Sequence, residues 1–204
     1  RSVSRGLGDV YKRQIHAIEQ FMISFNNTQS PFDDALLHAI SQDTSLEEDF
    51  PSFSPSQNRG KQLFTANCAS CHLIANSGYY EAYFGSGKLR ACNGLDTEYE
   101  DKGKGAHEPE TEFNGVFKVP NLRNIAVSGP YMHDGFFATL EDVIEHYSEN
   151  IQPHDNLDPL LKEEDGQPKQ MNFSQQEVAD LIAFLGTLTN EHLLTHDQWS
   201  DPFK

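Results

Sequence analysis

The sequence predicts an all-α fold, and three kinds of observation support this. Apolar residues recur at helical spacing, as in 140–147, where they fall at i, i+3, i+4 and i+7. Capping boxes at 139–142 and 174–177 mark helix starts. Strand patterns are missing apart from a short extended piece at 116–119. Helices joined by long polar loops are therefore expected.

The N-terminal part of the chain predicts two helices and a linker. The first helix begins where apolar residues start to recur every three or four positions, at Ile15, Ile18, Met22 and Phe25. A second, short helix covers 32–40. An acidic linker with two prolines follows at 41–55. We expect this part to be a helical arm without chemically reactive side chains.

Three further helices are predicted from their first residues. Ser56 caps a helix that runs toward the cysteines at 68 and 71, Thr139 opens the next, and Ser174 opens the last. The last helix carries an apolar stripe, made of Val178, Leu181, Ile182, Leu185 and Leu188. We expect the helix that Ser56 begins to pack near this stripe. In the Thr139 helix the same periodicity turns Tyr147 inward and His146 about 100° away from it.

Cys68, Cys71 and His72 form a C-x-x-C-H motif, which is the attachment signature of a c-type haem. The two thiols bond to the porphyrin, and the imidazole becomes a ligand of the iron. A structural zinc site would need four ligands, and Cys92 is the one other cysteine in the sequence. A thioredoxin-like redox pair would need a βαβ pattern around it. The sequence thus predicts haem c.

Charge and hydropathy exclude several classes of partner. Fifteen Lys and Arg against 31 Asp and Glu give a formal charge of −16. Nucleic acid is excluded, because phosphate binding needs the opposite sign. An acidic surface favours a basic, soluble partner such as a small electron carrier, or serves only solubility. No apolar run reaches the length of a membrane span.

The first 14 residues (RSVSRGLGDVYKRQ) are basic and rich in glycine, unlike the acidic remainder. We expect them to be non-native sequence, and the chain to be a fragment of a longer reading frame. No signal peptide is visible. Haem is attached to C-x-x-C-H outside the bacterial cytoplasm, so a periplasmic location and an export signal beyond this sequence are expected.

Four segments carry a family resemblance. The stretch 117–135 (FKVPNLRNIAVSGPYMHDG) resembles the C-terminal haem domain of the bacterial dihaem cytochrome c peroxidase and MauG family. The segments 138–140 and 181–189 also resemble that domain, and 15–51 resembles the family's inter-domain helix and linker. The resemblance covers nearly the whole chain after the first 14 residues.

The resemblance implies an all-α, cytochrome c-like haem domain over 56–190, preceded by the arm and linker at 15–55 and followed by a tail at 191–204. It implies an electron-transfer domain of a peroxidase, which takes electrons from a small cytochrome c or cupredoxin and passes them to a second haem that reduces hydrogen peroxide. The alternatives are a MauG-like enzyme that oxidises a protein, and a stand-alone mono-haem carrier. A homodimer stays open.

The resemblance also implies the second axial ligand of the iron. Family members place Met or, in the MauG branch, Tyr fourteen residues after the histidine that matches His133, and this count reaches Tyr147. A Tyr ligand would give a low-potential haem, whereas Met raises the potential. Tyr147 as a mere core residue and Met132 as the ligand remain alternatives. His146, His154 and Met171 are expected at the surface or in loops.

Three lesser assignments complete the candidate site. By resemblance, His133 helps to hold the haem environment, and the main-chain oxygens of Ser128 and Pro130 bind calcium. Arg123 pairs with a haem propionate or else forms a surface salt bridge. Cys92 is expected to be a small packed or partly exposed thiol rather than a ligand.

Overall fold

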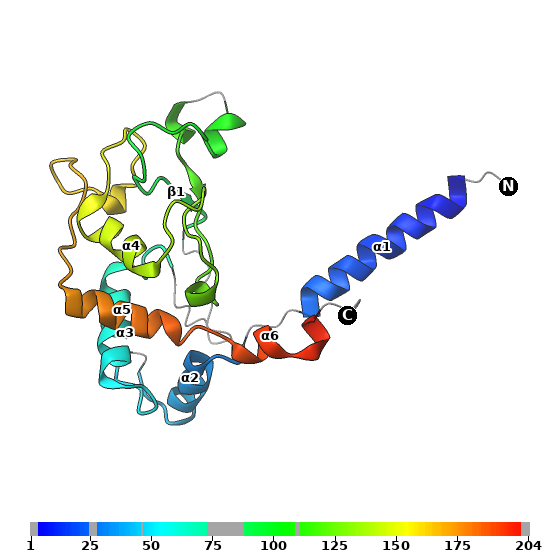
Figure 1. Ribbon diagram of the computed structural model, residues 1–204, viewed down its shortest axis with the longest axis horizontal. Coiled ribbons are helices and arrows are strands. Elements are labelled where there is room, and N and C mark those ends of the chain that lie inside the picture. Colours follow the sequence, from blue (N-terminus) through cyan, green and yellow to red (C-terminus); the bar gives the residue numbers. More distant parts are fainter. Residues whose placement is uncertain (1–3, 25–27, 46, 73–87, 109–110, 201–204) are drawn as a thin grey trace.

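The computed structural model describes residues 4–24, 28–45, 47–72, 88–108 and 111–200. Within these ranges the chain is mainly helical, as predicted (Figure 1). The α-helices are α1 (Ser4–Ser24), α2 (Pro31–Ser41), α3 (Pro55–Asn67), α4 (Leu140–Glu145), α5 (Gln175–Gly186) and α6 (Glu191–Thr195). Short 3-10 helices lie at Lys104–Ala106, Thr111–Phe113, Ile125–Val127, Pro159–Leu161 and Asp197–Trp199.

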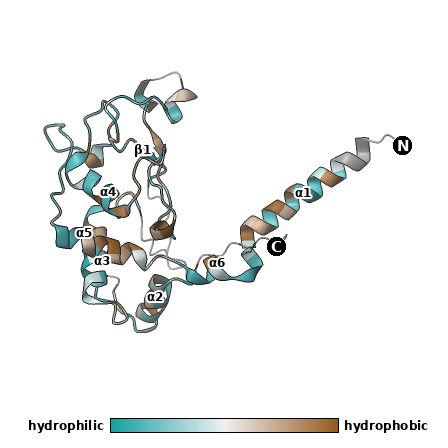
Figure 2. Ribbon diagram, in the orientation of Figure 1, coloured by the Kyte–Doolittle hydropathy of each residue, from teal (hydrophilic) through white to brown (hydrophobic). Residues whose placement is uncertain are grey.

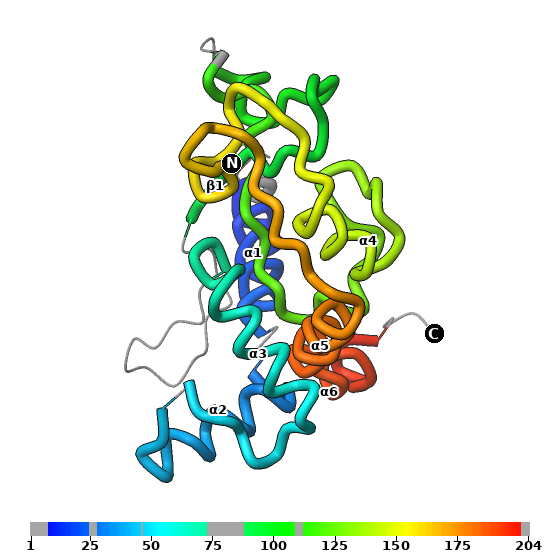
Figure 3. The backbone as a smooth tube through the Cα atoms, turned by 90° about the vertical axis from the view of Figure 1, so that its left-hand side faces the viewer, coloured from blue at the N-terminus to red at the C-terminus, as the bar shows by residue number. Residues whose placement is uncertain are grey.

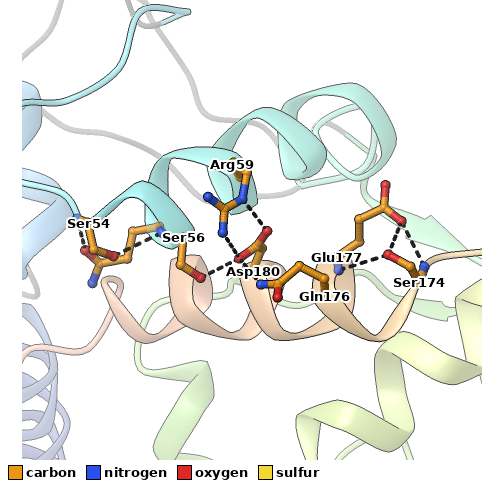
Figure 4. A network of polar contacts seen from close by, with 8 residues as sticks. Ser54, Ser56, Arg59, Ser174, Gln176, Glu177 and Asp180 are labelled. Atoms are coloured by element: carbon orange, nitrogen blue, oxygen red, sulfur yellow. Dashed lines mark hydrogen bonds and ion pairs between the residues drawn. The ribbon is translucent and has the colours of Figure 1, made fainter.

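Helices α3 and α5 lie side by side at the centre of the molecule, as the sequence predicts (Figures 1 and 3). They approach closely at Gly60, where an added Cβ would lie 1.9 Å from the carbonyl oxygen of Asp180. Arg59 of α3 donates two hydrogen bonds to the Asp180 carboxylate, of 2.7 and 2.9 Å. Ser56 and Gln176 also donate to this carboxylate (Figure 4). The pair is thus joined by backbone contact and by a polar network.

The predicted helix caps agree with the structure in all but one place. Capping boxes are present at Thr139 of α4 and at Ser174 of α5, as predicted. The predicted cap at Ser56 is wrong, because Ser54 caps α3. Ser54 accepts a hydrogen bond from the Gln57 amide, and Pro55 stands in the first turn, where its missing N–H costs nothing.

The main core is formed by α2, α3, α4, α5 and loop residues that include Phe50, Phe53 and Leu122. Phenylalanine rings meet edge to face or tilted: Phe32 of α2 lies 5.9 Å from Phe184 of α5, and Phe64 of α3 lies 5.2 Å from Phe184. The predicted stripe on α5 is buried at Val178, Leu181, Leu185 and Leu188. Because α2 buries Phe32 here, the second helix of the predicted arm is part of the main core.

A second, smaller layer covers one side of this core. Strands β1 (Arg90–Ala91) and β2 (Phe117–Lys118) pair antiparallel, so the extended piece expected at 116–119 is a strand with a partner that the sequence did not reveal. Helix α4 continues as a π-helix, η4 (His146–Asn150). A small apolar cluster lies here, composed of Cys92, Leu95, Tyr99 and Val116.

Helix α1 projects from the body (Figure 1). It begins at Ser4, earlier than the predicted start at Ile15. Apolar and polar residues alternate along it (Figure 2), and large apolar side chains are exposed, among them Tyr11, Ile15, Ile18 and Met22. Phe21 packs against Trp199 with ring centroids 6.0 Å apart. Among the described helices, α1 included, none is long and apolar enough to cross a membrane.

Candidate haem site

The C-x-x-C-H motif lies on the turn that ends α3. Cys68 is the C-cap of the helix and donates its N–H to the carbonyl of Phe64. The amides of Cys71 and His72 then donate back to the Cys68 carbonyl, at 3.1 and 2.9 Å. This turn gathers both thiols and the imidazole at one end of α3. The residues that follow, 73–87, lie outside the described part of the chain.

The imidazole of His72 is fixed in one tautomer by the backbone. Its Nδ1 lies 3.2 Å from the carbonyl oxygen of Pro120. Because a carbonyl only accepts, Nδ1 carries the hydrogen and Nε2 keeps its lone pair. Burial lowers the pKa of His72, and the bond to Pro120 opposes this in part. The ring therefore presents an unprotonated Nε2, the atom that a haem iron needs.

The two thiols are partly buried and held in the neutral form. Burial raises the pKa of Cys68 to about 12, and the neighbouring Cys71 adds to the effect. Burial also raises the pKa of Cys71, and the carboxylate of Asp158 contributes. Neither thiol is paired in a disulfide. Both remain available for thioether formation.

Tyr147 lies on the side of the two cysteines, in the first turn of the π-helix. Its hydroxyl is 3.5 Å from the side-chain amide nitrogen of Asn93. Burial raises the pKa of Tyr147, the bond from Asn93 opposes this, and the nearby Cys68 and Cys71 raise it further. The inward direction predicted for Tyr147 agrees with this placement, although its role as an iron ligand stays a prediction.

The prediction that His146 lies at the surface is wrong. The side chain is 2% exposed, and its Nε2 donates to the carbonyl of Asn93 at 3.1 Å. The reason is a distant contact: this hydrogen bond to Asn93 holds the His146 ring inside, and helix periodicity does not report it. Burial lowers the pKa of His146, so the ring is neutral.

Met132, the alternative ligand, reaches the same place from a different segment. Its sulfur lies 3.3 Å from the side-chain amide nitrogen of Asn93. Its backbone is left-handed, with φ of 72°, an uncommon conformation for a residue with a side chain. The two candidate ligands, Met132 and Tyr147, are therefore brought together by one amide.

Arg123 forms an ion pair with α2. Its guanidinium donates two hydrogen bonds to the carboxylate of Asp33 in α2, of 2.7 and 2.8 Å. The Arg123 side chain is 10% exposed and that of Asp33 is 7% exposed. The pair is thus a buried ion pair and not the surface salt bridge weighed as an alternative. Pairing of Arg123 with a haem propionate stays a prediction.

The remaining candidates lie around this centre. His133 is exposed and stacks on Phe117, with ring centroids 3.8 Å apart. Ser128 and Pro130 are exposed on the segment before Tyr131, and calcium binding there stays a prediction. Cys92 is 1% exposed, which confirms a packed thiol. His154 approaches its sulfur at 3.7 Å, so this histidine is partly buried.

A cavity of about 660 Å³ lies apart from the C-x-x-C-H motif. Its lining includes Tyr99, Asn114, His154 and Lys162 and none of Cys68, Cys71 and His72. Among the described residues, no group of three or more His, Cys, Asp and Glu side chains could hold a metal ion.

The donor set fits haem c. Two neutral thiols, an imidazole with an unprotonated Nε2, and a phenol or a thioether as a further ligand are the groups that a six-coordinate c-type haem uses. Sequence reasoning missed two residues of this site, Asn93 and Pro120. The contacts of the Asn93 side chain join separate segments, and a carbonyl acceptor such as that of Pro120 leaves no mark on a sequence.

Comparison with known proteins supports this assignment. Residues 57–189 match the family model of cytochrome c. The methylamine utilization protein MauG of Methylorubrum extorquens is 32% identical over 86% of this chain and 43% of its own length. Cytochrome c551 peroxidase of Nitrosomonas europaea is 32% identical over 72% of this chain and 38% of its own length. The chain thus spans less than half the length of these curated relatives.

One solved structure extends the likeness to three dimensions. It is a MauG-like protein associated with microbial copper homeostasis, which superposes with a TM-score of 0.65 at 28% identity. The alignment covers 87% of this chain and 56% of the other. The predicted all-α, cytochrome c-like fold is therefore confirmed.

Proposed function

Because the chain belongs to the cytochrome c family, and within it to the dihaem cytochrome c peroxidases and MauG proteins, we propose that it is the electron-transfer haem domain of a peroxidase-like oxidoreductase. The domain accepts electrons from a small periplasmic redox protein and passes them to a second haem, elsewhere in the whole protein, where hydrogen peroxide is reduced. Haem c, when bound, supplies the one-electron centre.

The observation that carries the proposal is the state of His72. The Pro120 carbonyl holds the Nδ1 hydrogen, so the lone pair of Nε2 is available beside two unpaired thiols. A histidine that served only packing would not need this arrangement next to a C-x-x-C pair. Protein residues then set the electronics of the centre through the sixth ligand and its hydrogen bonds.

Net charge supports the choice of donor. The chain carries a formal charge of −16, which attracts a basic partner over a distance of about 10 Å at moderate salt. A small basic cytochrome c or cupredoxin would therefore associate faster than an acidic one.

Calcium is a further part of the proposal. Bound at the main-chain oxygens of Ser128 and Pro130, it would stiffen the segment before Tyr131.

A second candidate function rests on Tyr147. A phenolic ligand lowers the reduction potential of a haem relative to a thioether ligand, which suits an enzyme that oxidises a partner protein. The placement of Tyr147 beside Cys68 and Cys71 favours this MauG-like alternative. The two candidates share the haem site and differ in what the whole protein oxidises.

The first test asks whether the chain binds haem covalently. The chain, matured with the bacterial haem-attachment machinery, should retain haem after acid–acetone extraction. The double variant Cys68→Ala/Cys71→Ala, which removes both thioether bonds, should lose it, while Cys92→Ala should keep it as the matched control. A wild-type chain that releases all its haem would end the proposal.

The second test separates the two candidate functions. Low-temperature EPR and visible spectra of the ferric chain are compared with those of Tyr147→Phe and Met132→Leu. A change in Tyr147→Phe alone supports the MauG-like alternative. A change in Met132→Leu alone supports the high-potential electron relay.

A third test concerns the electron donor. Reduction of the haem domain by a basic reduced cytochrome c should slow as the salt concentration rises, and a rate independent of salt would exclude electrostatic docking.

A further inference from the structure

The side-chain amide of Asn93 lies between the two candidate axial ligands. Its nitrogen is 3.3 Å from the sulfur of Met132 and 3.5 Å from the hydroxyl oxygen of Tyr147. A carboxamide nitrogen carries two hydrogens, so one amide serves both acceptors at once. No such role follows from the haem motif, because Asn93 lies 21 residues beyond His72 in the sequence.

The backbone around Asn93 is anchored from several directions. Its own carbonyl accepts the Nε2 hydrogen of His146 at 3.1 Å. The neighbouring carbonyls are bonded too. The Cys92 carbonyl accepts a hydrogen bond from the Asp158 amide at 3.0 Å, and the Gly94 carbonyl accepts one from the Gln152 amide at 2.7 Å. The position of the amide is therefore set by the segment that carries Tyr147 and by the loop after it.

Gly94 shows how tightly this segment is packed. It adopts φ of +67°, and a Cβ there would lie 2.7 Å from the carbonyl oxygen of Gln152. Because Gly94 has a left-handed backbone and contacts the segment after η4, it leaves little room for the neighbouring Asn93 to move. Asn93 thus stands on a rigid support, as a group that orients a ligand must.

The two groups that accept hydrogen bonds from Asn93 differ in strength as acceptors. A phenolic oxygen is a good acceptor, and better still when it bears charge, whereas a thioether sulfur is a weak one. An N–H donor in this position therefore favours the tyrosine as the group that faces the cysteines. The left-handed backbone of Met132 fixes the thioether beside it.

We propose that Asn93 is the positioning residue of the haem site, and that its amide selects Tyr147 over Met132 as the sixth ligand by hydrogen bonding to the phenolic oxygen. This inference rests on the proposed haem function. It concerns the residue that chooses the ligand, which the C-x-x-C-H motif and the family resemblance leave open.

The test uses the haem-loaded chain and two variants of Asn93. Asn93→Asp keeps the shape but replaces the two N–H donors with an acceptor of negative charge, and Asn93→Leu removes hydrogen bonding altogether. The matched control is Asn172→Asp, the same chemical change at an exposed position. Haem content, ferric EPR, visible spectra and midpoint potential are measured for each, beside Tyr147→Phe.

The expected result is a transfer of ligation. In Asn93→Asp and Asn93→Leu the ferric spectrum moves toward that of Tyr147→Phe, while Asn172→Asp matches the wild type. The midpoint potential rises in Asn93→Leu, the variant that adds no charge. Adding Asn93→Leu to Tyr147→Phe changes the spectrum no further. Circular dichroism identifies a variant that has lost its fold, and the isosteric Asn93→Asp then carries the test.

Two results would overturn the inference while leaving the haem function intact. In one, Asn93→Asp and Asn93→Leu keep the wild-type spectrum and potential although Tyr147→Phe changes both. In the other, the wild type has a Met/His spectrum that Tyr147→Phe does not alter. Failure of the haem function is distinct, because the wild type would then contain no covalent haem.

Discussion

The guanidinium of Arg123 and the carboxylate of Asp33 form a buried, two-bond ion pair between α2 and the segment before the 3-10 helix at Ile125–Val127. Ser30 adds two more hydrogen bonds to the same carboxylate, from its amide at 2.9 Å and its hydroxyl at 2.7 Å. Burial alone would raise the pKa of Asp33, but these bonds outweigh it and the pKa lies below its usual value. Helix α2 is thereby joined to the rest of the body by charge as well as by Phe32.

Removal of the Asp33 charge should destabilise the fold. Asp33→Asn leaves the guanidinium buried without its counter-charge, and breaking a buried pair costs about 3 kcal/mol. We expect a loss of this size in the free energy of unfolding, measured by urea titration. The control is Asp34→Asn, one residue along α2 and exposed, which should change stability by less than about 0.5 kcal/mol. Equal effects of the two variants would contradict a special role for Asp33.

The close approach of α3 and α5 predicts opposite effects for two glycine substitutions. In Gly60→Ala the new Cβ would meet the Asp180 carbonyl and the Cβ of Phe184, at 1.9 and 2.8 Å. The helices must separate, and we expect the free energy of unfolding to fall by about 3 kcal/mol or more. Gly186, the last residue of α5, has no atom within 4 Å of an added Cβ. Gly186→Ala should therefore gain about 0.5 kcal/mol from helix propensity.

Thermal unfolding followed by circular dichroism at 222 nm measures both glycine variants. A Gly60→Ala protein as stable as the wild type would show that α3 and α5 do not meet at this position.

Asp180 predicts a pH dependence of stability. Hydrogen bonds from Arg59 are the main cause that lowers the pKa of Asp180 from 3.8 to about 2, with Ser56 and Gln176 contributing. A carboxyl group with a lower pKa in the folded state stabilises the fold above its unfolded pKa, and this contribution disappears as pH falls through the folded value. The loss should therefore occur between about pH 4 and pH 2.

The measurement is the unfolding free energy of the wild type and of Asp180→Asn at a series of pH values. The variant lacks the titrating group, so the difference between the two proteins should be constant above pH 5 and should shrink toward pH 2. A difference that stays constant across this range would mean that the Asp180 carboxylate has an ordinary pKa.

Much of the fold was predictable because its signals are local. The capping boxes at Thr139 and Ser174, the stripe on α5 and the C-x-x-C-H turn all lie within a few residues of sequence. The one misplaced cap was at Ser56, because two serines flank Pro55 and the proline fits the first turn of the helix better than the position before it.

The missed features depend on contacts between distant residues. Strand β1 is only two residues long and owes its form to β2. The burial of His146 depends on the carbonyl of Asn93, 53 positions away. The placement of Met132 beside Tyr147 depends on an amide from a third segment. Periodicity cannot report such contacts, so the candidate ligands could be identified from sequence but not their common neighbour.

The π-helix at His146–Asn150 bears on how such sites evolve. A π-turn holds one residue more than an α-turn, so it is what a one-residue insertion leaves in a helix. Loss of a single codon there would restore the α-helix and rotate the side chains on one side of the deletion by about 100° relative to those on the other. The residue that faces the cysteines could then change between descendants without any substitution of Tyr147 itself.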